Sequence, residues 1–192
     1  MTNDNEIAVG IFLFNNIFTN SMEYIQNAEQ YGIDWITAEV LVDPKNGISG
    51  NNYSARDTDL IILNDNATLK NSYLKELREQ YDVSVEGPLK RYQEYYWAQY
   101  EKKQDPQLLR YGKYQRFNDH VDDHPKLDTR RISMTYYLND DYTGGEIEFP
   151  RFNLKIKPKA GQLLIFPSTY VYNHKINPVT SGNRYCIVQW LG

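Results

Sequence analysis

The chain has 192 residues, enough for one domain with a buried core, and 25 acidic against 21 basic residues give a formal charge of −4. This balance excludes a generally basic nucleic-acid-binding protein. A mean hydropathy of −0.68 and the lack of any apolar run near the roughly 20 residues of a membrane span predict no transmembrane helix. The single cysteine, Cys186, excludes a disulfide framework and any Cys-rich zinc or iron–sulfur site. With no basic leader at the N-terminus, we expect a soluble, cytoplasmic protein.

The first part of the chain mixes strand and helix signals. The apolar run 7–14 has the length of a strand, and residues 20–23 have the spacing of a capping box. They predict a helix that ends at Gly32, where a left-handed conformation is tolerated. Residues 33–42 predict a second strand, and the polar residues 43–58 predict a long loop.

Two further helices are predicted before the C-terminal half. Residues 67–81 carry apolar side chains at helical spacing, and Gly87-Pro88 is expected to break the chain after them. A separate helix is then predicted over 89–102, which is dense in aromatic residues. We interpret its aromatic stripe as a seam against a sheet, because two glutamates among these residues disfavour a nucleic-acid surface.

From residue 108 the pattern changes to short strands separated by turn sequences. About eight strand-like segments follow, which is typical of an all-β sandwich or barrel. We therefore predict one α+β domain over residues 1–192, with mixed helix and strand support in 1–105 and a β core in 106–192. The predicted strands cover residues 108–111, 115–118, 131–138, 146–149, 152–156, 162–166, 170–174 and 184–191.

Two of the three histidines of the chain form a candidate metal site. His120 and Asp122 are two residues apart near the end of a predicted strand, so their side chains are expected on one face. His174 ends another predicted strand and reaches the same cavity if the two strands are neighbours. Two histidines and one carboxylate form the facial triad of non-haem Fe(II) oxygenases. A His-x-Asp pair alone more often has a structural role, and His124 beside Pro125 is expected to be a surface-loop histidine.

A set of segments around this pair keeps a fixed order and spacing. They are residues 110–112, 115, 117, 120–122, 131–140, 144–146, 149–150, 156–161, 164–166, 174, 178–179, 182, 184 and 190. As a set they resemble the prolyl 4-hydroxylase type of 2-oxoglutarate/Fe(II)-dependent oxygenases. The resemblance implies a double-stranded β-helix, a jelly-roll or cupin-like core supported by the N-terminal helices. The first hundred residues match only in the order of their elements.

The resemblance also implies roles for individual residues. His120, Asp122 and His174 would bind Fe(II). Arg184, ten residues after His174, would pair with the 5-carboxylate of 2-oxoglutarate, for which a planar guanidinium fork is suited, although many collagen-type enzymes have lysine there. The resemblance further implies that Tyr137, Tyr111 and Thr135 contact the co-substrate and that Trp190 contacts the substrate.

The implied reaction is hydroxylation of a C–H bond, at C4 of a prolyl residue in a peptide or protein. It would use Fe(II), 2-oxoglutarate and O₂, with ascorbate in support, and release succinate and CO₂. Such substrates, often Pro-rich, lie extended in a groove. We expect the loop 46–58, with Arg56 as a substrate contact, and the segment 123–129 to flank that groove. No nucleic-acid or membrane partner is expected, and the oligomeric state is not predicted.

Three alternatives stay open on the sequence. The same chemistry could act on lysyl residues, free amino acids or another small molecule, because lysyl hydroxylases share this residue pattern. The fold could instead serve as a catalytically silent peptide-binding module, although the three metal ligands and Arg184 are all retained. A metal-free carbohydrate-binding domain would use the 17 tyrosines as platforms for sugars.

Overall fold

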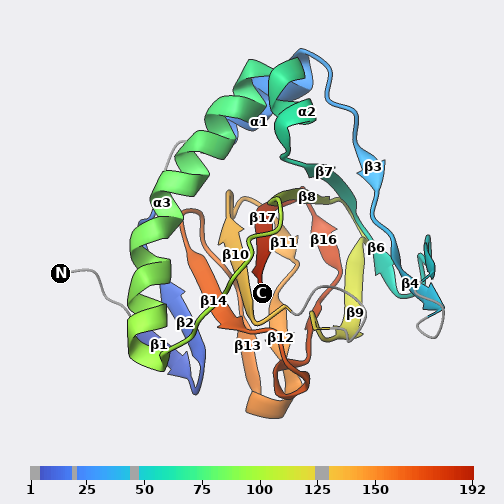
Figure 1. Ribbon diagram of the computed structural model, residues 1–192. Coiled ribbons are helices and arrows are strands. Elements are labelled where there is room, and N and C mark those ends of the chain that lie inside the picture. The colour runs from blue at the N-terminus through green and yellow to red at the C-terminus, as the bar shows by residue number, and fades with distance from the viewer. Residues whose placement is uncertain (1–4, 19–20, 44–47, 124–129) are drawn as a thin grey trace.

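The structure is a computed structural model and describes residues 5–18, 21–43, 48–123 and 130–192. Its centre is a pair of antiparallel sheets packed face to face, with helices against the outer face of the larger sheet (Figure 1). This arrangement confirms the predicted α+β class, a double-stranded β-helix with supporting helices.

The larger sheet joins strands from both halves of the sequence. The N-terminal hairpin forms one edge, and its partner strand in the sheet comes from far along the chain. In spatial order the strands are β1 (Asn5–Ala8), β2 (Ile11–Phe14), β14 (Leu163–Pro167), β10 (Ile132–Tyr137), β17 (Arg184–Leu191), β8 (Gln107–Tyr111), β7 (Asp59–Ile62) and β3 (Ile36–Thr37).

The smaller sheet carries the candidate metal ligands on two neighbouring strands. In spatial order its strands are β13 (Leu154–Ile156), β12 (Ile147–Phe149), β15 (His174–Ile176), β9 (Arg116–His120) and β6 (Arg56–Asp57). The remaining short elements are the pairs β11 (Thr143–Gly144) with β16 (Val179–Ser181) and β4 (Val40–Asp43) with β5 (Ile48–Gly50), and two 3₁₀ turns at Pro150–Phe152 and Tyr170–Tyr172.

Two apolar clusters hold these layers together, one on each face of the larger sheet. Along β10, Met134 and Tyr136 belong to the cluster under the helices, while Tyr137 belongs to the cluster between the sheets. Strand side chains alternate between faces, so Thr135 points to the same side as Tyr137. This face of β10 is the one that meets the candidate metal ligands.

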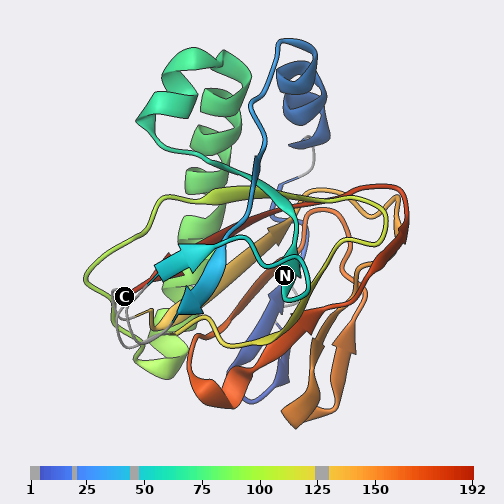
Figure 2. The ribbon, with the colours of Figure 1, turned by 90° about the vertical axis from the view of Figure 1, so that its right-hand side faces the viewer.

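The helices are α1 (Ser21–Gln30), α2 (Asp65–Lys70) and α3 (Ser72–Tyr96). α1 and α2 lie together at one end of the molecule, and α3 runs from there along the side of the larger sheet (Figures 1 and 2). The prediction of α1 is confirmed, although residue 20, its expected cap, lies outside the described residues.

The predicted break at Gly87-Pro88 is wrong, because α3 continues through it as one helix of 25 residues. A proline inside a helix costs about 3 kcal/mol relative to alanine. Here the cost is offset by burial, since Tyr81, Val85, Leu89 and Tyr92 form a stripe that packs on the larger sheet. The helix ends at Tyr96 rather than at residue 102, with Trp97 in a left-handed conformation.

Several predicted strands also differ from the structure. The run 7–14 is two strands of a hairpin, because Gly10 adopts a φ of +77° where a Cβ would collide with the ring of Tyr172. The run 33–42 contains only β3 and the start of β4, and the expected loop 43–58 contains β5 and β6. In the predicted strand 170–174, Tyr170–Tyr172 form a 3₁₀ turn and only His174 is in a strand, as the first residue of β15. The predicted core strands β8, β10, β14 and β17 are confirmed.

The cluster under the helices shows how the two parts of the sequence depend on each other. It combines residues of the first hundred, such as Phe14 and Leu77, with residues of the last sixty, such as Ile165 and Ile187. The assignment of one domain over 1–192 stays a prediction, to which this shared core adds support. None of the helices in the described ranges has the length and apolar character that a membrane crossing requires.

Candidate active site

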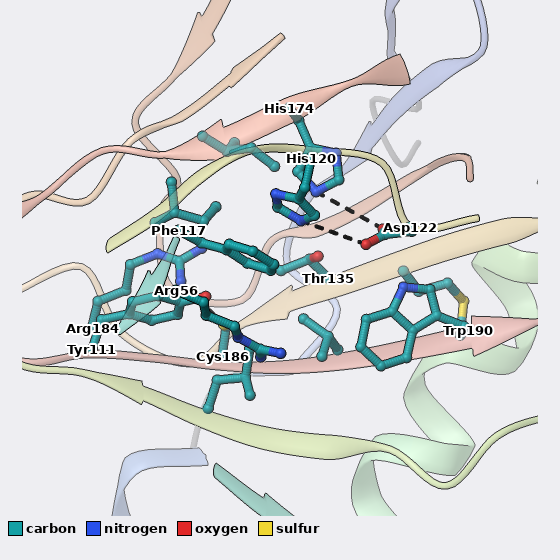
Figure 3. Close-up of a pocket in the computed structure, with 15 residues that line it drawn as sticks. Arg56, Tyr111, Phe117, His120, Asp122, Thr135, His174, Arg184, Cys186 and Trp190 are labelled. Atoms are coloured by element: carbon teal, nitrogen blue, oxygen red, sulfur yellow. Dashed lines mark hydrogen bonds and ion pairs between the residues drawn. The ribbon is translucent and has the colours of Figure 1, made fainter. Parts of the chain in front are cut away.

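Three side chains that could hold a metal ion meet where β9 ends and β15 begins. His120 is the last residue of β9, His174 is the first of β15, and the two are direct partners across these strands. Asp122 Oδ1 lies 3.6 Å from His120 Nε2, and Asp122 Oδ2 lies 3.9 Å from His174 Nε2 (Figure 3). All the ligand atoms lie within 4.8 Å of one another. The expectation that the two strands are neighbours is confirmed.

The reason given for the convergence of His120 and Asp122 needs correction. β9 stops at His120, so Asp122 is not on the same strand but on the bend that follows it. The carboxylate is held there by Ser133 of β10, whose Oγ donates a hydrogen bond of 2.7 Å to Oδ2. Ser133 Oγ also contacts Ser168 Oγ at 2.8 Å. Ser133 on the larger sheet therefore fixes the orientation of the Asp122 carboxylate, whereas the two histidines belong to the smaller sheet.

Hydrogen bonds at the far side of each imidazole favour one tautomer. His120 Nδ1 lies 2.8 Å from the carbonyl oxygen of Asn118, and His174 Nδ1 lies 3.1 Å from that of Tyr172. A carbonyl oxygen only accepts, so each Nδ1 carries the proton and each Nε2 lone pair faces Asp122. Both imidazoles are thus arranged as metal ligands.

Electrostatics favour a neutral His120 and an ionised Asp122, the forms in which these two groups bind a metal. Burial and the neighbouring His174 lower the pKa of His120 to about 3. Burial alone would raise the pKa of Asp122, but the two histidines and the hydroxyl of Ser133 lower it. Neutral imidazoles beside a carboxylate are the donor set of a non-haem Fe(II) site, so these residues fit that ion.

The aromatic ring of Phe117 stacks against the imidazole of His120. Its centroid lies 3.5 Å from that of His120 with an interplanar angle of 12°. The guanidinium of Arg56 lies over the ring of Phe117, 4.8 Å from the ring centroid. Arg56, expected in a loop, is in fact on β6 and 8% exposed, and its Nε has no hydrogen-bond partner.

Arg184 is a buried cation without a protein anion. Its side chain is 1% exposed, and its guanidinium lies 4.9 Å from the ring of Tyr111 and 5.2 Å from that of Tyr137. Nη1 donates to Cys186 Sγ at 3.2 Å, whereas Nε and Nη2 have no partner. Within the described part of the chain no carboxylate pairs with it. An unpaired buried charge is strongly unfavourable, so this site fits a carboxylate ligand such as the far end of 2-oxoglutarate.

A single cavity connects Arg184 with the metal cluster. Its wall includes Tyr111, Thr135, Arg184 and Trp190, four of the residues expected to bind co-substrate or substrate. Figure 3 shows Arg184 and Trp190 at opposite ends of this cavity, with the imidazoles between them. Tyr137 is not on the wall, but its hydroxyl lacks a partner beside Arg184.

The cavity opens into an outer groove of about 900 Å³. The residues that line both spaces are Arg56, Phe117, His120, Asp122 and Trp190. The groove continues over Ile36, Val40 and Ile62, so apolar side chains extend outward from the metal cluster.

Sequence reasoning missed several residues of this site. Arg130 covers the ring of Trp190 at 3.7 Å and donates to the carbonyl oxygen of Asp122 at 3.3 Å. Tyr142 lies buried near Arg184, and Phe117 stacks on His120. Side chains three apart on a regular strand point to opposite faces, so alternation does not predict the stack of Phe117 on His120, where the pairing of β9 with β15 is irregular. The contact between Tyr142 and Arg184 joins segments far apart in the sequence. His124, the segment 124–129 and residues 46–47 lie outside the described residues, so their expected roles stay predictions.

The double-stranded β-helix and the His-Asp-His cluster indicate the same class of protein as a comparison with known families. Residues 106–192 match the sequence model of the 2OG-Fe(II) oxygenase superfamily. That segment contains the three candidate metal ligands and Arg184, and the predicted resemblance to these oxygenases is confirmed. The cofactors that the superfamily's name implies, Fe(II) and 2-oxoglutarate, are the ones that the donor set and Arg184 fit.

Individual relatives point in the same direction. A PKHD-type hydroxylase of Colwellia psychrerythraea is 31% identical over 125 residues, which is 60% of this chain and 55% of that protein. Human prolyl 3-hydroxylase 2 is 35% identical over 71 residues, which is 34% of this chain and 10% of that protein. The chain thus spans about half, or less, of the curated relatives it matches.

The fold of nearly the whole chain is shared with a solved structure. The viral collagen prolyl hydroxylase of Paramecium bursaria Chlorella virus-1, solved as a complex with 2OG, superimposes with a TM-score of 0.68 at 22% sequence identity. The superposition covers 95% of each chain. It therefore includes the N-terminal helices as well as the β core.

Proposed function

We propose that this protein is an Fe(II)- and 2-oxoglutarate-dependent dioxygenase that hydroxylates a prolyl residue in a peptide or protein, most simply at C4. The observation that carries this proposal is the presence, in one cavity, of a His-Asp-His cluster and an unpaired buried arginine. A metal-only site would not need the arginine, and an anion-binding site would not need the cluster.

The bound cofactors would supply the oxidising power for C–H hydroxylation, with succinate and CO₂ as the other products. His120, Asp122 and His174 would hold the metal on one face and leave the cavity side open. Arg184, with Tyr137, would orient the far carboxylate of 2-oxoglutarate by paired hydrogen bonds. The buried walls around Thr135 would exclude water from this end of the site.

The outer groove would receive the substrate chain. Trp190 and Arg56 lie where the groove meets the cavity, so they are the residues we expect to contact the target residue and its neighbours. A groove of about 900 Å³ has room for an extended peptide of several residues. The names of the relatives support a prolyl target, but they include a 3-hydroxylase and therefore do not favour one ring carbon over another.

A peptide panel tests the substrate. Pro-rich, single-proline and lysine-containing peptides would be incubated with the protein, Fe(II), 2-oxoglutarate and ascorbate, and examined by mass spectrometry for the gain of one oxygen atom. We expect oxidation of a proline-containing peptide, located by fragmentation and assigned to C3 or C4 by comparison with standards. Oxidation of lysine alone, or of a free amino acid alone, would replace the prolyl assignment and retain the chemistry.

The Asp122→Ala variant tests the metal assignment within the same assay. The variant leaves two histidines that cannot hold the metal as a facial triad, so we expect loss of substrate-dependent succinate release. Asp65→Ala, which removes an exposed carboxylate from α2, serves as the matched control and should leave the rate unchanged. Full activity of the Asp122 variant would contradict the assignment.

A further inference from the structure

The hydroxyl of Tyr142 belongs to a group of unpartnered donors around Arg184. Among the buried side-chain polar atoms that lack a hydrogen-bond partner in the described ranges, four gather here. They are Nε and Nη2 of Arg184 and the hydroxyls of Tyr137 and Tyr142. Orphaned donors are rare in folded proteins, so a cluster of four indicates a ligand that accepts from all of them.

The backbone places Tyr142 directly beside Arg184. A Cβ added to Gly145 would lie 3.0 Å from Cδ of Arg184 and 3.0 Å from Cε2 of Tyr142. The glycine backbone, at a φ of +65°, is therefore enclosed between the two side chains. The Tyr142 ring and the Arg184 side chain therefore both lie against Gly145, and the charge of Arg184 acts on the pKa of the Tyr142 hydroxyl. Like Tyr137, Tyr142 lies behind the wall of the cavity and not on it.

Contacts that do not involve its hydroxyl hold Tyr142 in place. Lys157 Nζ lies 3.5 Å from the ring centroid and donates to the carbonyl oxygens of Tyr142, at 3.0 Å, and Gly144, at 2.7 Å. The side chain is 4% exposed. Because the ring is fixed without the hydroxyl, that hydroxyl stays available to a ligand.

The number of donor atoms matches the acceptor capacity of one carboxylate. An ionised carboxylate has two oxygens and about four lone-pair sites, and the guanidinium and the two phenols offer four donor atoms. We propose that Tyr142 is a second phenol that donates a hydrogen bond to the far carboxylate of 2-oxoglutarate, alongside Arg184 and Tyr137. This inference rests on the proposed function and adds a co-substrate-binding residue to it.

Both phenols keep their protons under ordinary conditions. Burial raises the pKa of Tyr142 and of Tyr137, and the neighbouring Arg184 offsets only part of this effect. The two hydroxyls are therefore donors, which is the role that a carboxylate ligand requires.

Binding of two 2-oxo acids to the Tyr142→Phe variant tests the inference directly. The probes are 2-oxoglutarate and 2-oxopentanoate, which differ only in the far carboxylate, titrated calorimetrically into Mn(II)-loaded protein without oxygen. A hydrogen bond to a charged group is worth about 1.5–3 kcal/mol, so we expect the variant to bind 2-oxoglutarate at least ten-fold more weakly. Its affinity for 2-oxopentanoate should equal that of the unmodified protein.

Tyr136→Phe is the matched control. Tyr136 is also a buried tyrosine, but it lies on the face of β10 that packs under the helices and not on the face of Tyr137. Its hydroxyl donates to the carbonyl oxygen of Phe18 at 2.6 Å. Without ligand, this variant should lose thermal stability, while Tyr142→Phe should lose much less, because the Tyr142 hydroxyl makes no hydrogen bond of normal geometry and has only Arg184 nearby. With 2-oxoglutarate, only the Tyr142 variant should show weaker binding.

The outcomes separate this inference from the function on which it rests. If the unmodified protein binds 2-oxoglutarate and Tyr142→Phe binds it equally well, the role of Tyr142 is wrong and the proposed function stands. A variant that weakens both 2-oxo acids equally would show a structural effect and also overturn the role. If the unmodified protein binds no 2-oxoglutarate, both proposals fail.

Discussion

Arg184 combines two properties that are costly together, since it is 1% exposed and lacks an anion among the described residues. An unpaired charge in such a place costs several kcal/mol after relaxation. Its partial compensation comes from the rings of Tyr111 and Tyr137 and from Cys186. The residue therefore makes sense as part of a binding site and not as a structural cation.

The Arg184→Met variant separates these two roles. Without ligand, we expect it to be as stable as the unmodified protein or more stable, because a buried unpaired charge is replaced by an apolar side chain. It should bind 2-oxoglutarate at least ten-fold more weakly, because the paired hydrogen bonds to the carboxylate are lost. Urea denaturation and calorimetry measure the two effects. A large loss of stability with unchanged binding would mean that Arg184 is structural.

Much of the site could be predicted at this scale, because its main residues follow local spacing. His120-x-Asp122 and the ten-residue interval from His174 to Arg184 are visible in the sequence. Phe117 and Tyr142 could not be assigned roles in the same way. Phe117 stacks on His120 although side chains three apart on a regular strand point to opposite faces, and the pairing of β9 with β15 is irregular there. Tyr142 meets Arg184 through packing of segments far apart in the sequence, for which a single sequence gives no signal.

Among the elements, α3 shows how packing overrides local preference. The sequence contains a glycine and a proline at its centre, and both disfavour a helix interior. The helix nevertheless continues, because the buried stripe that includes Val85 and Leu89 lies on both sides of Pro88. The strand prediction succeeded for β10, β14 and β17, where apolar runs are long and buried, and also located the short strands β12 and β13. It missed β5 and β6, which lie in the polar stretch expected as a loop.

Two valines of α3 provide a matched test of this packing. Val85 is 1% exposed and Val83 is 74% exposed, and they share one helix. We expect Val85→Ala to lower the free energy of unfolding by about 2 kcal/mol, because it leaves a cavity under the helix. Val83→Ala should change it by less than about 0.5 kcal/mol. Equal effects in urea denaturation would show that α3 does not contribute to the core as described.

The turn between β11 and β12 can be tested with a second pair. Gly145→Ala places a Cβ at 3.0 Å from both Arg184 and Tyr142, whereas Gly32→Ala, also at positive φ, meets nothing within 4 Å. We expect both variants to lose about 1 kcal/mol of stability from backbone strain, and Gly145→Ala to lose more because its Cβ is also crowded by its neighbours. Only Gly145→Ala should also weaken 2-oxoglutarate binding in calorimetry, and the same weakening at Gly32 would contradict the specific role of this turn.

At the scale of the whole molecule, the site is a joint product of both sheets and of both sequence halves. The smaller sheet supplies His120 and His174, the larger sheet supplies Ser133 and Arg184, and the first hundred residues supply Arg56. Metal and co-substrate should therefore stabilise the fold as a whole and not one segment of it.

Ligand linkage makes this claim measurable. A ligand at a hundred-fold excess over its dissociation constant stabilises the native state by about 2.7 kcal/mol. We expect the melting temperature to rise with Mn(II), and to rise further with 2-oxoglutarate only when the metal is present. A co-substrate effect that is independent of metal would contradict a shared site.

The most direct test of the central claim is an anaerobic absorption titration of 2-oxoglutarate into the Fe(II)-loaded protein. The proposed site predicts a weak visible charge-transfer band that saturates at one equivalent, since the co-substrate would bind the metal at one end while Arg184 holds its far carboxylate. The band should be missing in Asp122→Ala and should require a much higher 2-oxoglutarate concentration in Arg184→Met. A protein that binds both compounds without the band, or that shows the same band in both variants, would contradict the account.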